Sequence, residues 1–244
     1  MTREQNLNHV LFFDLECVPQ VSSFFDLDDG LKALREKKAE RLGPSLGLED
    51  ASADELYDNR SGIYAEFGKV IVISVGYLAK NEEGERVLRV KSFYGDDERE
   101  VLENFFELLH TYYDKSFHKL AGHNIKDFDI PYICRRASVL GLELPNILDP
   151  RGKKPREIEH LDTLEMWRFG DRRTYVSLDL LCRVMGVETP KDDISGEQVA
   201  RVYRDDKDIE RVKTYCEKDV VATAKLCMKL LGDRDGVEHV EIAE

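Results

Sequence analysis

The sequence has no long apolar run and few cysteines. No stretch approaches the roughly 18 consecutive apolar residues that a membrane-spanning helix needs, and residues 1–9 lack the apolar core of a secretion signal. The 5 cysteines are widely spaced, without the paired spacing of a zinc site or a dithiol redox motif. We therefore expect a cytoplasmic protein with no membrane partner, whose thiols are reduced and buried.

Basic residues are also in deficit. The 244 residues include 36 lysines and arginines against 49 aspartates and glutamates, which gives a formal net charge of −13. This sign disfavours a protein that coats nucleic acid through a basic surface alone. It leaves room for an enzyme that meets phosphates through divalent cations, because the ions supply the positive charge that carboxylates lack.

The segments with strand character come mostly early in the chain. Val10–Cys17 and Val70–Ala79 are apolar runs typical of central strands. Arg86–Tyr94 alternates in hydrophobicity after a turn-forming segment, so we expect it to form a hairpin with the run before it. Lys119–His123 and Ile158–Leu164 are shorter candidate strands.

Helical periodicity fills the spaces between these strands and dominates the end of the chain. The expected helices are 28–42, 98–113, 131–140, 177–186, 196–203 and 208–231. The chain has 42% apolar residues, enough for a core, and shows no internal repeat or low-complexity linker. We predict an α/β fold in a single domain over residues 1–244.

Residues 19–67 interrupt this pattern. Nearly fifty residues separate the first two predicted strands, far more than a hairpin connection requires. The segment holds a strongly charged helix followed by a Gly, Pro and Asp-rich remainder. It is either a lid or substrate-guiding insertion or an ordinary solvated excursion.

Two acidic residues lie at the end of the first apolar strand. Side chains two apart on a strand point to the same face, so Asp14 and Glu16 would present neighbouring carboxylates. With 49 acidic residues in 244, such a pair also arises by chance. The apolar strand makes it more significant, because buried carboxylates cost several kcal/mol unless cations or donors compensate them.

Other acidic positions are equally ambiguous when taken one at a time. Asp129 lies two residues before Pro131, where an aspartate is either a ligand or a helix cap. Tyr215 and Asp219 are four residues apart on the last long helix, so they share one face. A surface carboxylate and a rim tyrosine would explain that pair as well.

Taken together and in order, these motifs resemble the exonucleases that have four essential acidic residues and a tyrosine. The resemblance is closest to the proofreading domain of family B DNA polymerases. It rests on Asp14-Leu15-Glu16, on Asn124 with Phe128-Asp129, and on Tyr215 followed four residues later by Asp219. It implies a ribonuclease H-like fold, with a mixed central sheet flanked by helices. The sequence ends in an acidic tail soon after the tyrosine motif, so we expect no polymerase domain and no proofreading within one polypeptide.

The resemblance implies a 3′-to-5′ exonuclease with two divalent ions per active site, roughly 3.5–4 Å apart. Ligands that are all oxygen favour Mg²⁺ or Mn²⁺ over zinc. We expect Asp14 to bridge both ions, Glu16 and Asp219 to complete the coordination of the first ion, and Asp129 to hold the second ion directly or through water. A phenol with a pKa of about 10 is a poor base at neutral pH, so Tyr215 is expected to orient the attacking water.

Substrate contacts are expected from basic and aromatic residues. Asn124 and Phe128 accompany Asp129, although a turn former and a core anchor would look the same. The basic residues are Arg151, Lys153, Lys154 and Arg156, followed by Arg168, Arg172 and Arg173 beside Trp167, Phe169 and Tyr175. These segments either hold phosphates and stack bases or form a solvated loop and a helix rim.

Four further residues near the motifs have competing interpretations. Phe12 or Phe13 is either a stacking residue or, more simply, part of the core. Asp162 is a fifth acidic neighbour or a structural residue, and His123 is a packed histidine rather than a ligand.

The polymer is expected to be single-stranded DNA or DNA ends. RNA is the alternative substrate, because discrimination depends on packing around the 2′ hydroxyl, which the motifs do not report. The other alternative is a catalytically silent module of the same fold that binds nucleic acid. The presence of all four carboxylates argues against that second alternative.

Overall fold

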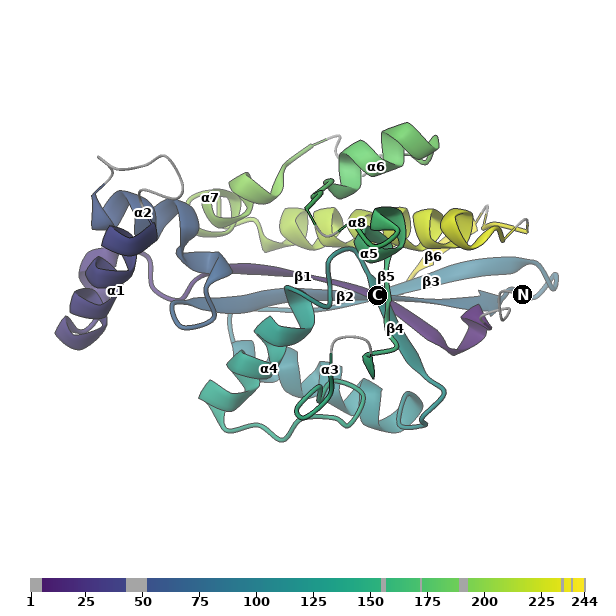
Figure 1. Ribbon diagram of the computed structural model, residues 1–244, viewed down its shortest axis with the longest axis horizontal. Helices are drawn as coiled ribbons and strands as arrows, with labels where there is room; N and C mark the ends of the chain where they lie inside the picture. The colour runs from purple at the N-terminus through teal and green to yellow at the C-terminus, as the bar shows by residue number, and fades with distance from the viewer. Residues whose placement is uncertain are drawn as a thin grey trace.

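The computed structural model describes residues 6–42, 52–154, 157–171, 173–188, 193–233, 235–237 and 239–243. Within these residues a six-stranded sheet has the order β5-β4-β1-β2-β3-β6 (Figure 1). Its strands are β1 (Val10–Pro19), β2 (Gly68–Lys80), β3 (Arg86–Tyr94), β4 (Lys119–Gly122), β5 (Leu161–Asp162) and β6 (His239–Ile242). β1 lies at the centre of the sheet, between β4 and β2.

The strand pairings are both parallel and antiparallel. β1 and β3 each pair with β2 in antiparallel fashion, and the β2–β3 hairpin predicted from the sequence is confirmed. β4 is parallel to β1, β5 is parallel to β4, and β6 is parallel to β3. The predicted mixed sheet is therefore confirmed.

Helices cover both faces of this sheet. They are α1 (Asp29–Leu42), α2 (Ala53–Arg60), α3 (Glu98–Tyr112), α4 (Asp129–Leu140), α5 (Thr163–Arg168), α6 (Leu178–Met185), α7 (Val199–Arg204) and α8 (Ile209–Leu231). α3 and α4 lie on one side of the sheet, and α5 to α8 lie on the other (Figure 1). α1 and α2 lie beyond one end of the long strands. In the described part of the chain, no helix is long and apolar enough to cross a membrane.

The side chains of β1 alternate between the two helical layers. Leu11, Phe13 and Leu15 belong to the core that packs against α3 and α4, whereas Val10 and Phe12 belong to the core under α8. Because a strand repeats every two residues, positions 14 and 16 share the α8 side with Phe12. Phe12 and Phe13 are completely buried, in agreement with the core interpretation of both.

The described part of the insertion over residues 19–67 has its own small core. Phe24, Leu27, Tyr57 and Phe67 bury one another there. Arg35 is buried among them and donates hydrogen bonds to the Ser61 hydroxyl and the Leu56 carbonyl oxygen. These residues are thus packed rather than solvated, and a substrate-guiding role for the insertion stays a prediction.

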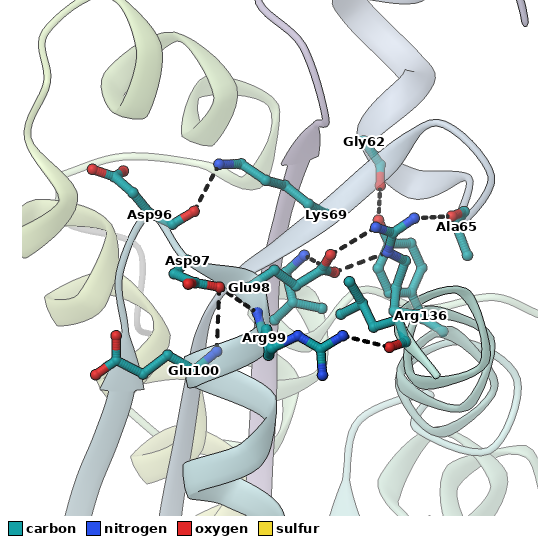
Figure 2. A network of polar contacts seen from close by, with 12 residues as sticks. Gly62, Ala65, Lys69, Asp96, Asp97, Glu98, Arg99, Glu100 and Arg136 are labelled. Carbon is teal, nitrogen blue, oxygen red and sulfur yellow. Dashed lines mark hydrogen bonds and ion pairs between the residues drawn. The ribbon is translucent and has the colours of Figure 1, made fainter. Parts of the chain in front are cut away.

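A buried ion pair joins the end of this insertion to α3 and α4 (Figure 2). The Arg136 guanidinium donates to both Glu98 carboxylate oxygens, at 2.9 and 2.6 Å. The Val70 backbone N–H also donates to Glu98, at 2.8 Å, and Arg136 donates to the Ala65 carbonyl oxygen. Nearby, the Tyr132 hydroxyl donates to the Gly62 carbonyl oxygen at 2.6 Å. Residues 62–70 are therefore held to both helices by buried polar contacts.

The structure differs from the sequence expectation at β5 and at the end of the chain. Only Leu161–Asp162 of the predicted strand 158–164 is a strand, because Asp162 caps a helix that begins at Thr163. β6 was not predicted. Its four residues, His239–Ile242, are too few to show a clear alternation, but they add a strand to the sheet edge beside β3.

Candidate metal and catalytic centre

β1 presents Asp14 and Glu16 toward α8. Asp14 is paired with Ser74 of β2 and Glu16 with Val72, and a β-bulge follows Glu16. One oxygen of each carboxylate and the Cys216 sulfur all lie within 4.8 Å of one another. The two carboxylates predicted to share a face therefore do so, and a thiol from α8 lies beside them.

Helix α8 supplies the second group of side chains. Tyr215 and Asp219 are both buried, and the Tyr215 hydroxyl hydrogen-bonds the Asp219 carboxylate. One residue after Tyr215, the Cys216 thiol contacts Asp14. The adjacent Glu217 is buried against the sheet, where the Ser92 hydroxyl of β3 donates to its carboxylate at 2.8 Å. These contacts fix α8 over β1 at the level of Asp14.

The loop between β4 and α4 places Asp129 at the same site. Phe128 is the N-cap residue of α4 and makes no capping hydrogen bond, while Asp129 is the first helical residue and is buried. Asp129 accepts a hydrogen bond from the Leu15 backbone, between the two β1 carboxylates. Asp129 is thus not the N-cap that the alternative interpretation required.

Asp162 organises this loop. Its carboxylate accepts hydrogen bonds from the backbone N–H groups of Asn124 and Lys126, and from those of Leu164 and Glu165 at the start of α5. Asn124 has a left-handed backbone with φ of 65°, which asparagine tolerates better than most residues. Asp162 therefore has a structural role, and Asn124 is the turn former proposed as the simpler interpretation.

A glycine permits the close approach of this loop to β1. A Cβ atom at Gly122 would collide with the Ile125 side chain and come within 2.9 Å of the Phe13 carbonyl oxygen. Phe128 packs against the core on the α4 side, with its ring centroid 5.5 Å from that of Tyr132. Its expected role as a core anchor agrees with this position.

The site is a cluster of buried carboxylates that repel one another. Burial raises the pKa of Asp14 and of Glu16 well above the usual range, and the carboxylates of Asp219 and Asp129 raise both further. Burial also raises the pKa of Asp129, to about 7. Among the residues that the structure describes, no lysine or arginine forms an ion pair with Asp14, Glu16 or Asp129. A bound cation would supply the missing compensation.

Tyr215 holds its proton firmly. Burial raises the pKa of its phenol, and the nearby carboxylates of Asp219, Glu16 and Asp14 raise it further. A group with this pKa donates a hydrogen bond at neutral pH and does not act as a base.

The predicted basic cluster lies apart from these carboxylates. Lys153 lines a pocket with Lys119 and His160, beside the residue where β4 begins, whereas Asp129 follows the end of β4. The Arg151 guanidinium pairs with Asp149 at 2.6 Å. Lys154 is exposed in the same loop, and Arg156 lies outside the described residues. Phosphate binding by this cluster stays a prediction.

The second basic and aromatic segment is joined through His123 to the loop that precedes Asp129. His123 follows β4 and is packed, with its ring nitrogens 2.9 Å from the Thr163 hydroxyl and from the Val176 carbonyl oxygen. This contact holds the loop that carries Phe169, which is 90% exposed, and Tyr175, which is 66% exposed. Phe169 has a positive φ of 45°, unusual for an aromatic residue.

The neighbouring side chains of this loop have different surroundings. Trp167 packs against a core formed by α6 and α8. Arg168 donates to the Thr174 carbonyl oxygen, and Arg173 pairs with Asp171 on the surface. Arg172 lies outside the described residues.

Sequence reasoning did not identify Cys216 or Glu217 as residues of this site. Both lie between Tyr215 and Asp219, where the helical period directs them to other faces of α8 than the one those two share. Cys216 contacts Asp14 of β1 and Glu217 contacts Ser92 of β3 only because α8 packs against the sheet. No pattern in the neighbouring sequence predicts these contacts.

This arrangement of sheet and helices is similar to a known polymerase structure. The family B DNA polymerase from Pyrobaculum calidifontis matches 91% of this chain with a TM-score of 0.55 and 20% identity, over 24% of its own length. The fold is thus a ribonuclease H-like α/β fold.

Sequence comparison gives a consistent result. A DNA polymerase from Pyrococcus glycovorans is 24% identical over 180 residues, and one from Desulfurococcus sp. (strain Tok) is 26% identical over 188 residues. Each match covers 66% of this chain, and the chain spans 22% of the length of these relatives.

A family model described as a predicted 3′-5′ exonuclease related to the exonuclease domain of PolB matches residues 63–242. The chain belongs to this family. The matched segment contains Asp129, Tyr215 and Asp219 and begins after Asp14 and Glu16, which the fold adds to it through β1.

Proposed function

We propose that the protein is a 3′-to-5′ exonuclease that hydrolyses phosphodiester bonds with two divalent ions, Mg²⁺ or Mn²⁺. The ligands would be Asp14, Glu16, Asp129 and Asp219. One observation carries the proposal: carboxylates from β1, from the start of α4 and from α8 lie together in a buried site without a cationic partner for Asp14, Glu16 or Asp129 among the described residues.

The donor set fits such ions. Carboxylate oxygens are the ligands that Mg²⁺ and Mn²⁺ prefer, and burial of several together is unfavourable without a positive charge. Bound ions supply an activated water and neutralise charge on the phosphate and the leaving oxygen. They would also lower the raised pKa values of Asp14 and Glu16 by attraction.

Each protein group then has a limited task. Asp14, Glu16, Asp129 and Asp219 hold the ions. Tyr215 keeps its proton, which it donates to Asp219, and its hydroxyl oxygen can accept a hydrogen bond from the attacking water, so we infer that it positions that water rather than removing a proton. Asp162 and Gly122 keep the loop before Asp129 close to β1.

We propose single-stranded DNA or DNA 3′ ends as the substrate, because the relatives are DNA polymerases. The exposed rings of Phe169 and Tyr175 suit base stacking, which tolerates any sequence. RNA is the second candidate polymer. The cytoplasmic location expected from the sequence stays a prediction.

The test is incubation of the purified protein with single-stranded DNA, RNA and duplex ends, each labelled at the 5′ end, with Mg²⁺ or Mn²⁺. We expect a ladder that shortens from the 3′ end, that EDTA stops and that Asp14→Asn does not produce. Binding without degradation of any polymer would favour the silent nucleic-acid-binding module. Cleavage that persists in EDTA would contradict the metal mechanism.

A further inference from the structure

A sulfur atom lies among the proposed oxygen ligands. The Cys216 Sγ is 3.6 Å from the Asp14 Oδ2 and 3.5 Å from the Asp14 carbonyl oxygen. The same sulfur lies within 4.8 Å of the nearest Glu16 carboxylate oxygen. Cys216 is completely buried and is a free thiol.

These separations suit a cation that accepts both sulfur and oxygen. A tetrahedral ion with a metal–sulfur distance of about 2.3 Å and a metal–oxygen distance of about 2.1 Å separates the two ligand atoms by about 3.6 Å. The observed distance between Cys216 Sγ and Asp14 Oδ2 is 3.6 Å. A thiol that donates a hydrogen bond to Asp14 would lie at a similar distance from its carboxylate. Measuring whether an ion binds to the sulfur therefore distinguishes a metal ligand from a hydrogen-bond donor.

The backbone and the packing restrict the movement of this thiol. Cys216 lies in the middle of α8, between Tyr215 and Glu217, and Ser92 of β3 holds Glu217. Asp14 and Glu16 lie on the central strand of the sheet. An ion therefore meets a preformed set of two carboxylates and one sulfur, with little rearrangement of the chain.

We propose that Asp14, Glu16 and Cys216 form a subsite for a thiophilic divalent cation of the Zn²⁺, Cd²⁺ and Co²⁺ class, with the Cys216 sulfur as a ligand. The inference rests on the proposed function in one respect, that Asp14 and Glu16 are metal ligands. Thiolates select such ions, whereas Mg²⁺ takes oxygen ligands and gains little from sulfur. The site then binds Zn²⁺ in competition with Mg²⁺, and the thiol releases its proton to solvent on binding.

Spectroscopic titration of the full chain with Co²⁺ tests the proposal directly. A sulfur ligand gives Co²⁺ a thiolate-to-metal charge-transfer band in the near ultraviolet, which carboxylates do not give. We expect the band in the wild type and its loss in Cys216→Ser. The matched control is Cys227→Ser, since Cys227 is also a completely buried thiol of α8 but lies in the core under β3, and it should keep the band.

Affinities measured by calorimetry extend the same test. Loss of a contact that supports a metal ligand weakens metal binding by about 10- to 100-fold. Loss of the sulfur ligand itself should weaken Co²⁺ binding by at least this factor. Mg²⁺ binding should change much less than Co²⁺ binding in Cys216→Ser, because Mg²⁺ gains little from a sulfur ligand. Zn²⁺ should inhibit Mg²⁺-dependent cleavage in the wild type and do so much less in this variant.

Two results would overturn the inference: a band of equal intensity in Cys216→Ser, or Co²⁺ that binds the wild type without a band. If Cys216→Ser does not fold, the ¹¹³Cd chemical shift of the wild type alone reports a sulfur ligand or its absence. Nuclease activity measured on the same samples separates the two proposals. Activity without the band refutes only the thiolate ligand, whereas the band without activity on any polymer refutes only the exonuclease.

Discussion

Two regions of the molecule bury acidic side chains, and they compensate the charge in different ways. On the α3–α4 face, Glu98 is held by two hydrogen bonds from Arg136 and one from the Val70 backbone. On the α8 face, Asp14 and Glu16 lie near other carboxylates and have no lysine or arginine ion-pair partner in the described chain.

The difference separates a structural carboxylate from the one that we propose as a metal ligand. At Glu98 the chain supplies its own cation, so the ion pair is complete on folding and serves to join residues 62–70 to α4. At Asp14 the described chain supplies no cation, so the carboxyl group either keeps a proton, as its raised pKa favours, or takes up a metal ion from solution. The sequence alone shows both only as acidic residues, and the location of the arginine in the structure distinguishes them.

The largest expected effect comes from removing one charge on the α8 face. Asp14→Asn should lower the metal-dependent cleavage rate by about 10²- to 10³-fold or more, the usual cost of one electrostatic stabiliser. The metal-free variant should melt higher than the wild type, because one repelling charge is gone. Single-turnover cleavage and thermal melts measure both. Full activity in Asp14→Asn would remove the basis for the comparison.

The same operation on the α3–α4 face should affect stability instead. Arg136→Met leaves Glu98 buried without its cation, which should cost about 3–5 kcal/mol of unfolding free energy. Urea unfolding measures the change. The double variant with Glu98→Gln is the control and should recover much of the loss. A single variant as stable as the wild type would show that Glu98 does not depend on Arg136.

Tyr215→Phe tests whether the tyrosine orients or removes a proton. If it only orients, the hydroxyl accounts for a limited part of the rate, and the variant should be slower by up to about 100-fold but still measurable. Metal affinity should change little, because the carboxylates remain. A rate as low as that of Asp14→Asn would contradict a purely orienting role for Tyr215. It would also weaken the comparison with Glu98, because Tyr215 would then contribute to the charge balance of the site.

The pH dependence of the metal-free protein should show the smallest effect. The pKa of Asp129 is raised to about 7, whereas an unfolded aspartate has a pKa of about 3.9. Between these values the folded state binds more protons, so the unfolding free energy contributed by Asp129 falls as pH rises from about 4 to about 7. The pKa shifts of Asp14 and Glu16 have the same direction.

Thermal melts at several pH values, with EDTA and with Mg²⁺, check this expectation. The stabilisation by Mg²⁺ should be greatest above about pH 7, where the carboxylates are ionised. Each kcal/mol of stabilisation should raise the melting temperature by about 2–4 °C. Asp14→Asn should reduce the pH dependence of the EDTA samples. Mg²⁺ stabilisation that is equal at all pH values would contradict an uncompensated cluster.

The strands and helices with strong hydrophobic periodicity were predictable from the sequence. Alternation over Arg86–Tyr94 predicted β3 with the bounds that the structure has, and the apolar Val10–Cys17 predicted β1 to within two residues. β5 is too short to show any period, and its Asp162 is also the N-cap residue of the helix that begins at Thr163. β6 has only four residues and joins the sheet through its pairing with β3, which lies far away in the sequence.

The candidate site was predictable where it follows local spacing. The shared face of Asp14 and Glu16 and that of Tyr215 and Asp219 both follow from strand and helix geometry. The contact of Cys216 with Asp14 was not predictable, because it joins residues 202 apart. The same is true of the pairing between Glu98 and Arg136, for which neither residue gives a local signal.

The position of α8 along the chain has a consequence for synthesis of the protein. Helix α8 begins at Ile209, long after β1 has been made, and it brings Tyr215 and Asp219 to carboxylates that begin at Asp14. A domain folds as a unit, and side chains of α8 complete the core on one face of β1 and β3, so the site cannot assemble before this helix leaves the ribosome. Truncated products that lack α8 would carry the acidic residues of β1 without Tyr215 and Asp219, and the proposed cleavage would be withheld until translation has passed residue 219.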